Sequence, residues 1–261
     1  MRPSLRWTAL GALVLTSPAA ARATQVPTRY RIDQSLSQEV DGSVAGQSKQ
    51  TIAFKTSSFV SVSLTDSAGG KAMKVVVDSI KGDSTTPIPS AVLDSVKGEV
   101  YRAFISKEGR PGLLQASSNS AAAGQIQGLL SDFFPWVRAG IRPGQTWADT
   151  SVNTSGEGTD TVTVKRVINY RAVPPEPRQP PKSVRVATDY SSQVAGMQPT
   201  PSGPARIEGT GKGTGSYLVS PEGKYIGGEW EMSSALQLSA SFTPQPLPIS
   251  LRQSTKVSTI K

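Results

Sequence analysis

The chain has 261 residues, contains neither cysteine nor histidine, and carries a formal net charge of +9 from 28 basic and 19 acidic side chains. Without cysteine it has no disulfide framework, thiolate nucleophile, iron–sulfur cluster or lipid-modified cysteine. Without histidine it lacks a Ser-His-Asp triad and an imidazole base. The basic residues are spread singly or in pairs and are not interleaved with aromatic residues, so we expect no nucleic-acid binding.

The first 23 residues have the layout of a secretory signal peptide. Arg2 and Arg6 precede a short apolar stretch at 7–16, and Ala21-Arg22-Ala23 fits the small-x-small cleavage rule. We therefore predict cleavage after about Ala23 and a secreted or periplasmic protein. An uncleaved membrane anchor is the alternative, but the apolar stretch is far shorter than the ~20 residues of a transmembrane helix. No later stretch is long enough either, so we expect the mature protein to be soluble.

Most of the remaining chain alternates apolar and polar residues, which predicts β-strands. The first strand starts at Tyr30 and continues to Val40, where Asp41-Gly42 predicts a turn. Further alternating segments follow at 52–64, 73–77, 162–170, 184–190 and 249–260. The longest alternation, 226–242, has apolar residues at even positions, which predicts one long strand in a broad, bent antiparallel sheet.

Two segments have helical signals. Residues 90–97 begin with serine and are followed by Gly98, which predicts a short helix. Residues 120–134 carry an apolar stripe of Ile126, Leu129, Leu130 and Phe133 at helical spacing, and Pro135 should end the helix. The strand at 207–219 has glycine at 209, 211, 213 and 215 on one face. We expect the second helix, rather than a ligand, to fill this strip.

An internal repeat divides the chain. Ser106-Lys107-Glu108-Gly109-Arg110 resembles Ser220-Pro221-Glu222-Gly223-Lys224, and an apolar pair precedes each copy. The pattern predicts the same hairpin turn twice. We therefore interpret residues 24–261 as one β-rich domain that could consist of two related halves, 24–140 and 141–261, although chance similarity between turns is the alternative.

The sequence offers little for catalysis. No Gly-x-Ser-x-Gly elbow is present, and Lys212 in the glycine-rich stretch is followed by glycine rather than the Ser or Thr of a phosphate-binding loop. Calcium is the only metal for which the sequence offers ligands, through oxygen donors, and no calcium-loop pattern occurs. Glu229 and Glu231 are a conceivable hydrolase pair, but polar alternation on a strand produces such pairs routinely. We expect no enzyme activity, catalytic residues, cofactor or metal.

The overall layout resembles uncharacterised bacterial secreted β-proteins and, more distantly, the lipoprotein-carrier (LolA/LppX-like) half-barrels of the cell envelope. The resemblance rests on the signal peptide, Tyr30-Arg31-Ile32, the segment Pro143 to Trp147 and the two Ser-x-Glu-Gly turns. It implies a curved antiparallel sheet capped by helices, with an apolar concavity for acyl chains.

We therefore predict a mainly β (α+β) fold: a large curved antiparallel sheet or half-barrel with one or two short helices on its concave side. The favoured function is non-enzymatic sheltering of a lipid or acyl chain between sheet and helix. The candidate cavity residues are Ile126, Leu129, Leu130, Phe133, Trp230, Met232 and Leu236. The alternative is a structural or adhesive envelope module with a filled core, which would bind an envelope protein partner through its surface.

Overall fold

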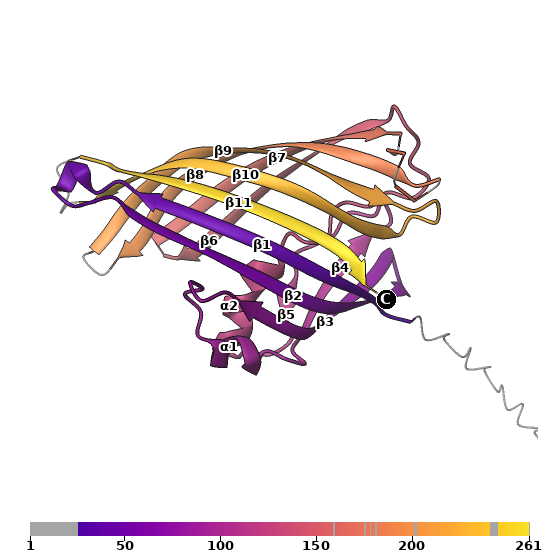
Figure 1. The fold of residues 1–261 in the computed structure, drawn as a ribbon. Helices are drawn as coiled ribbons and strands as arrows, with labels where there is room; N and C mark the ends of the chain where they lie inside the picture. Colours follow the sequence, from indigo (N-terminus) through magenta and orange to yellow (C-terminus); the bar gives the residue numbers. More distant parts are fainter. Residues whose placement is uncertain are drawn as a thin grey trace, which may run out of the picture.

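The computed structural model describes residues 26–158, 160–174, 176–177, 179–180, 182–200, 203–240 and 245–260. The predicted signal peptide and its cleavage site lie outside these residues. The described chain forms one antiparallel sheet of 11 strands, which does not close on itself, and two short helices (Figure 1). This confirms the predicted fold class.

The sheet consists of two meanders that meet at the strands nearest the chain ends. Its order is β5-β4-β3-β2-β1-β11-β10-β9-β8-β7-β6, and β1 pairs with β11. The strands are β1 (Thr28–Val40), β2 (Gln50–Ser67), β3 (Gly70–Gly82), β4 (Val100–Ser106), β5 (Gln115–Ala116), β6 (Thr146–Glu157), β7 (Asp160–Val173), β8 (Val184–Thr200), β9 (Gly203–Val219), β10 (Tyr225–Ala240) and β11 (Leu247–Ile260).

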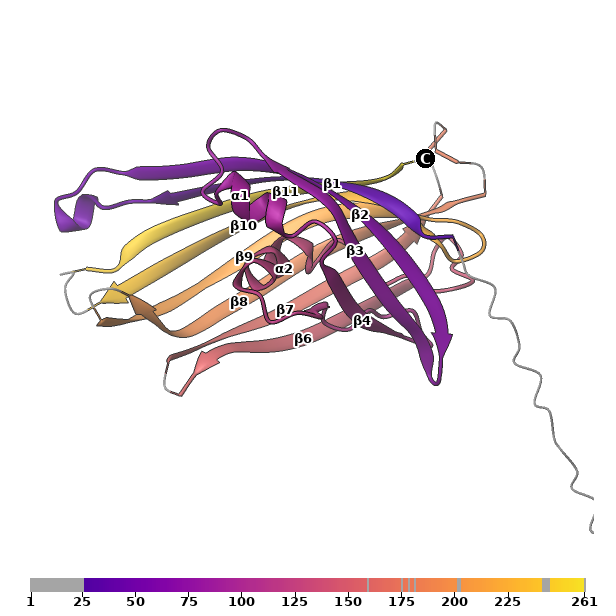
Figure 2. The same ribbon diagram turned by 90° about the horizontal axis from the view of Figure 1, so that it is seen from below.

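Both helices lie on the same side of the sheet, within its curve (Figure 2). They are α1 (Ser90–Ser95) and α2 (Ala121–Leu130), and a 3-10 turn, η1 (Ser43–Ala45), joins β1 to β2. The hydroxyl of Ser120 caps α2 by accepting a hydrogen bond of 3.0 Å from the Ala123 amide. The helix ends at Leu130, short of the predicted 134, and turns at 131–134 bring Phe133 and Phe134 into the core.

The helices cover only one end of the sheet, and the hydrophobic core lies there. Ile126 and Leu130 of α2 are fully buried, as are Ile32 on β1 and Val60 on β2. The hydroxyl of Tyr101 on β4 donates to the Ala123 carbonyl of α2 at 2.9 Å, and burial raises the pKa of Tyr101 to about 12. At this end of the sheet, the apolar residues of the alternating strands therefore face the helices.

Aromatic side chains connect the two meanders across the covered end. Tyr30 on β1 stacks on Tyr225 at the start of β10, with ring centroids 5.5 Å apart, and its hydroxyl donates to the Tyr225 carbonyl at 2.9 Å. Tyr217 and Tyr170 continue the series edge to face, and Trp147 on β6 stacks on Tyr170 at 5.2 Å. These rings bury large apolar areas and pack the two meanders against each other at this end.

The two Ser-x-Glu-Gly turns have the same hydrogen bonds. In the turn after β4, Gly109 donates to the Ser106 carbonyl at 2.9 Å, and in the turn after β9, Gly223 donates to the Ser220 carbonyl at 2.9 Å. Both glycines have positive φ values, 83° and 75°, which explains their identity. The sequence repeat is therefore a repeat of turn geometry, and the duplication of whole halves stays a prediction.

The glycine strip of β9 is filled differently from our expectation. A side chain at Gly213 would meet Met232, and one at Gly215 would meet Trp230, both on the neighbouring strand β10. At Gly211 the nearest atoms belong to Ser192 and Ser234. Flanking strands, not the helix at 126–134, occupy the space, because large side chains of β10 lean over the bare backbone next to them.

Candidate functional site: a trough beyond the helices

Burial on the helix side of the sheet decreases along β1, β2 and β11, whereas Leu236 on β10 and Ile207 on β9 stay buried farther along. The register aligns Ser58, Ile32 and Val257 in one row, and all three are buried. Two residues further along, the row consists of Thr56, Gln34, Thr255 and Trp230. The next row, Phe54, Leu36, Gln253 and Met232, is only half-buried, and beyond it Ile52 is 49% exposed.

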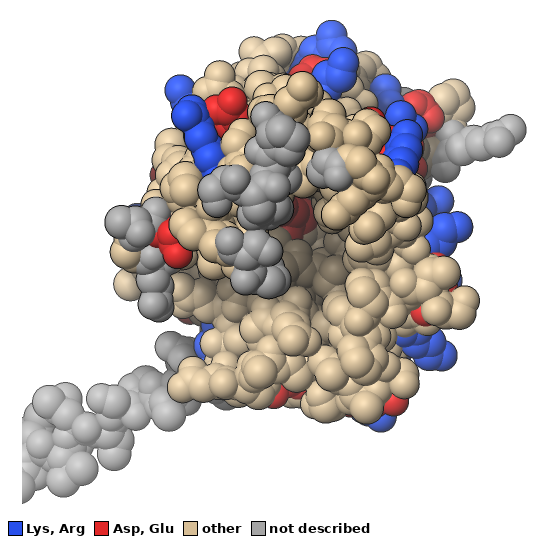
Figure 3. Space-filling view, turned by 90° about the vertical axis from the view of Figure 1, so that its left-hand side faces the viewer, with Lys and Arg blue, Asp and Glu red and all other residues tan. Residues whose placement is uncertain are grey.

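The apolar face therefore continues past the end of the core. Figure 3 looks at the end of the sheet where β1 ends and β2 begins, and it shows a hollow bordered largely by uncharged residues. We call the helix-side surface beyond the helices the trough and define it by Leu36, Phe54, Met232, Leu236 and Leu251. An open, apolar, concave surface of this kind suits an apolar ligand.

The structure separates the predicted cavity residues into two groups. Ile126, Leu130 and Phe133 are at most 2% exposed and belong to the packed core, with Leu129 and Trp230 packed partly buried against it. Met232 and Leu236 lie on β10 beyond the helices, where Met232 is half-buried and Leu236 is buried at 8% exposure. The helix and the trough are thus not the two walls of one cavity, and the space between helix and sheet is filled.

The trough walls that sequence reasoning missed come from β1, β2 and β11. Leu36, Phe54 and Leu251 each have the same parity as buried residues on their own strands. That parity was visible in the sequence, but their proximity to Met232 required the pairing of β1 with β11. The strand order is a long-range property that alternation does not encode.

A row of polar side chains separates the core from the trough. Thr56 and Thr255 are each 3% exposed and Ser58 is fully buried, yet their hydroxyl oxygens have no hydrogen-bond partner in the part of the chain that the structure describes. The side-chain oxygen of Gln34, between Thr56 and Thr255, is also buried and unpartnered. Each such group costs about 1–3 kcal/mol, so several together are unusual in an apolar surface.

A groove crosses the opposite face of the same strands. Two adjoining pockets, of about 1170 and 780 Å³, share Ser35, Lys55, Thr214, Glu231 and Ser254. Gln34, Thr56 and Thr255 border the smaller pocket, but their side-chain oxygens are buried on the helix side. The charged residues Arg31, Lys55 and Lys256, which point to the other face of the same strands, are exposed. The groove therefore opens away from the helices. A twisted sheet is saddle-shaped, so each face can be concave along one direction.

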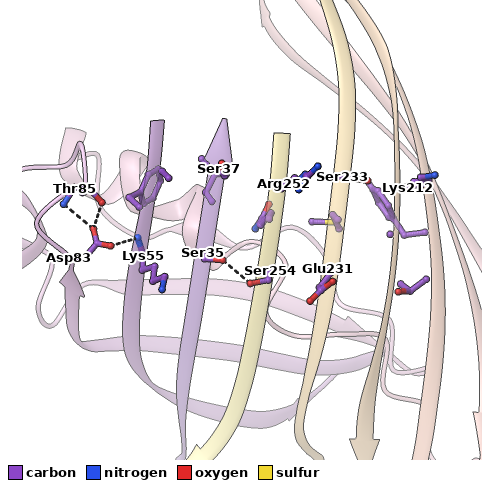
Figure 4. A pocket seen from close by; sticks show the side chains of 18 of the residues that line it. Ser35, Ser37, Lys55, Asp83, Thr85, Lys212, Glu231, Ser233, Arg252 and Ser254 are labelled. Atoms are coloured by element: carbon purple, nitrogen blue, oxygen red, sulfur yellow. Dashed lines mark hydrogen bonds between the residues drawn. The ribbon is translucent and has the colours of Figure 1, made fainter. Parts of the chain in front are cut away.

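The groove contains charged side chains of both signs (Figure 4), and the trough residues Leu36, Phe54 and Met232 also border its larger pocket. Its larger pocket is lined by the basic residues Lys55, Lys212 and Arg252 and by the acidic residues Asp83, Asp189 and Glu231. Asp83 accepts hydrogen bonds from the Lys55 amide at 3.0 Å and the Thr85 hydroxyl at 2.7 Å, and the bond from Thr85 lowers the pKa of Asp83. Glu229 and Glu231, the conceivable hydrolase pair, lie on this exposed face.

No protein-family model matches this chain, and no curated protein matches it either. Within the described residues, no helix is both long and apolar enough to cross a membrane. In the same ranges, no cluster of three acidic side chains is placed to hold a metal ion. Function must therefore be argued from the trough, the polar row and the groove.

Proposed function

We propose that the protein is a non-enzymatic, secreted or periplasmic protein that shelters a hydrophobic ligand, the acyl chain of a lipid, in the trough. The observation that carries the proposal is the change in burial along single strands. Leu36 and Phe54 have the parity of the core residues Ile32 and Val60, yet they are only half-buried. Among the described residues, no helix packs over them as α2 packs over the core.

An acyl chain matches the trough in chemistry and shape. Burying apolar surface gains roughly 25 cal/mol per Å², and a linear chain can follow the strands and cover side chains of several rows. The inner end of the trough is closed by the packed core, so the ligand would enter at the open end in Figure 3. The predicted signal peptide supports the proposal, because an exported carrier would meet envelope lipids.

One observation favours a second candidate function. The space between α2 and the sheet is filled, with Ile126 and Leu130 fully buried, as expected for a structural or adhesive module. Such a module would bind an envelope protein partner through its surface, and the groove would be the natural place. The two functions use opposite faces of the same strands, so paired variants can separate them.

The test compares neighbouring residues that face opposite sides of β10. Met232→Lys places a charge in the trough, and Ser233→Lys places the same charge in the groove. Binding of a fluorescent long-chain fatty acid and of an uncharged naphthylamine dye would be measured by titration. We expect Met232→Lys to weaken the binding of both probes by about tenfold or more, because a buried charge disfavours apolar contact, and Ser233→Lys to leave it unchanged.

The outcomes separate the two functions. Failure of the wild-type protein to bind either probe, together with lipid-free protein from its native host, would exclude the carrier function. A loss of binding in Ser233→Lys but not in Met232→Lys would place the ligand on the groove side. Circular dichroism of each variant checks that the sheet is intact.

A further inference from the structure

We infer that the polar row at the inner end of the trough, Gln34, Thr56, Ser58 and Thr255, binds the uncharged hydrogen-bonding end of the trough ligand. This inference rests on the proposed function and adds a direction of entry and a ligand class. The ligand would be a long-chain alcohol, or an ester with a free hydroxyl, inserted with its polar end first.

The strand register gathers these side chains into one small area. Gln34 on β1 pairs with Thr56 on β2 and with Thr255 on β11, so the three side chains lie in line on adjacent strands. Neighbouring strands are about 4.8 Å apart, which spreads the three residues over about 10 Å. Ser58 lies two residues from Thr56 on the same face of β2, about 7 Å along the strand.

The unpartnered oxygens point to a missing partner. Four buried side-chain oxygens in one patch have no hydrogen bond to any described residue, although Gln34 is directly paired with both Thr56 and Thr255. Buried hydroxyls in native proteins nearly always have a partner, from the protein, from water or from a ligand. Their position between the core and the half-buried Leu36 and Phe54 places them where the tip of a chain lying in the trough would arrive.

The surroundings favour an uncharged group. On the helix side of β1 and β11 no residue is acidic or basic, and the neighbours of the polar row are Ile32, Leu36, Val257 and Gln253. A carboxylate or ammonium group buried here would lack a counter-ion, at a large desolvation cost. A hydroxyl group can both donate and accept, which matches the threonine hydroxyls and the amide oxygen of Gln34.

The experiment measures displacement of the uncharged naphthylamine dye by three competitors with the same chain length: an alkane, a primary alcohol and a fatty acid. The proteins are wild type, Thr56→Val, Thr255→Val and Ser58→Ala, with Thr214→Val on the exposed face as the matched control. We expect wild type to prefer the alcohol to the alkane. Each polar-row variant should weaken the alcohol by about tenfold, as for the loss of one hydrogen bond, and leave the alkane unchanged.

Each outcome supports or overturns the inference. If wild type binds the dye but does not distinguish alcohol from alkane, the polar row is not a ligand site, although the carrier function survives. If Thr56→Val and Thr255→Val change the melting temperature but not the alcohol-to-alkane ratio, the row binds internal water only, and the inference fails. Tighter binding of the fatty acid than of the alcohol at neutral pH would overturn the uncharged ligand class. Absence of dye binding in wild type would instead contradict the proposed function itself.

Discussion

The two ends of the central strands have the same alternation of apolar residues but different surroundings. At one end, Ile32 and Val60 are buried beneath the helical layer, whereas at the other end Leu36 and Phe54 continue the pattern half-buried. The sheet therefore presents more apolar surface than the protein's own helices cover. The covered end contains the packed core, and the open end is where we propose that the ligand binds.

The largest expected effect on stability comes from comparing a Phe→Ala substitution at each end of the sheet. Phe133, at 2% exposure, contacts Tyr30 and Phe134 with ring centroids about 6 Å apart, so Phe133→Ala should cost about 3–5 kcal/mol of the free energy of unfolding. Phe54 is half-buried in the trough, and Phe54→Ala should cost about 1 kcal/mol. Chemical denaturation measures both. An equal loss of free energy of unfolding in the two variants would mean that the covered end and the open end are packed alike, and it would contradict the distinction drawn between them.

A smaller loss is expected where β9 passes close to β10 beside the trough. The β-carbon of an alanine at Gly209 would lie 2.2 Å from the Ala235 carbonyl oxygen and 2.7 Å from the Leu236 α-carbon. Backbone atoms cannot move aside easily, so Gly209→Ala should cost about 1–3 kcal/mol by overpacking. Thermal unfolding measures the change, and a neutral result would show that the open end lacks this tight strand contact.

The strands were predictable from the sequence because alternation is local. The long strand predicted at 226–242 is β10, with an irregular register between Tyr225 and Gly227, and the predicted last strand is part of β11. The short strands β4 and β5 were not predicted, because their apolar residues do not alternate over a long enough stretch. The end of α2 at Leu130 was also missed, since the aromatic pair after it serves the core rather than the helix.

The candidate site was predictable only in part. Met232 and Leu236 were recognised from the long alternation, but Ile126 and Phe133 were assigned to a cavity because a helical stripe does not reveal whether it faces a ligand or a sheet. The polar row left a visible signal in Gln34, which interrupts the apolar parity of Tyr30, Ile32 and Leu36. Its significance required knowing that Thr56 and Thr255 flank it.

A modest gain in stability is expected at the helix that covers the core. Gly124 lies inside α2, and a β-carbon added there would meet nothing within 4 Å. Alanine restricts the unfolded chain and favours the helix, so Gly124→Ala should raise the free energy of unfolding by about 0.5–1 kcal/mol. Because Gly124 is outside the trough, dye binding should not change. A loss of stability would mean that α2 is strained at this position.

The smallest effect should be an acid sensitivity of the two Ser-x-Glu-Gly turns. The Ser220 hydroxyl donates to the Glu222 carboxylate and lowers its pKa, as Ser106 does for Glu108 at 2.7 Å in the repeated turn. A depressed pKa means that the carboxylate contributes stability above its unfolded-state pKa, and that this contribution is lost as the pH falls through the folded-state value. Glu222→Gln should therefore lower the melting temperature slightly at neutral pH, and the difference from wild type should disappear in acid.

Ligand binding provides the contrast for this pH experiment. The helix-side residues of β1 and β11 in the trough include no acidic or basic group, so the affinity for an uncharged dye should stay constant over the pH range in which the turn weakens. Dye titrations at several pH values, in wild type and Glu222→Gln, measure this directly. An affinity that falls in parallel with the melting temperature would show that the open end depends on the two turns, and the open end and the turns would then have to be treated as one cooperative unit.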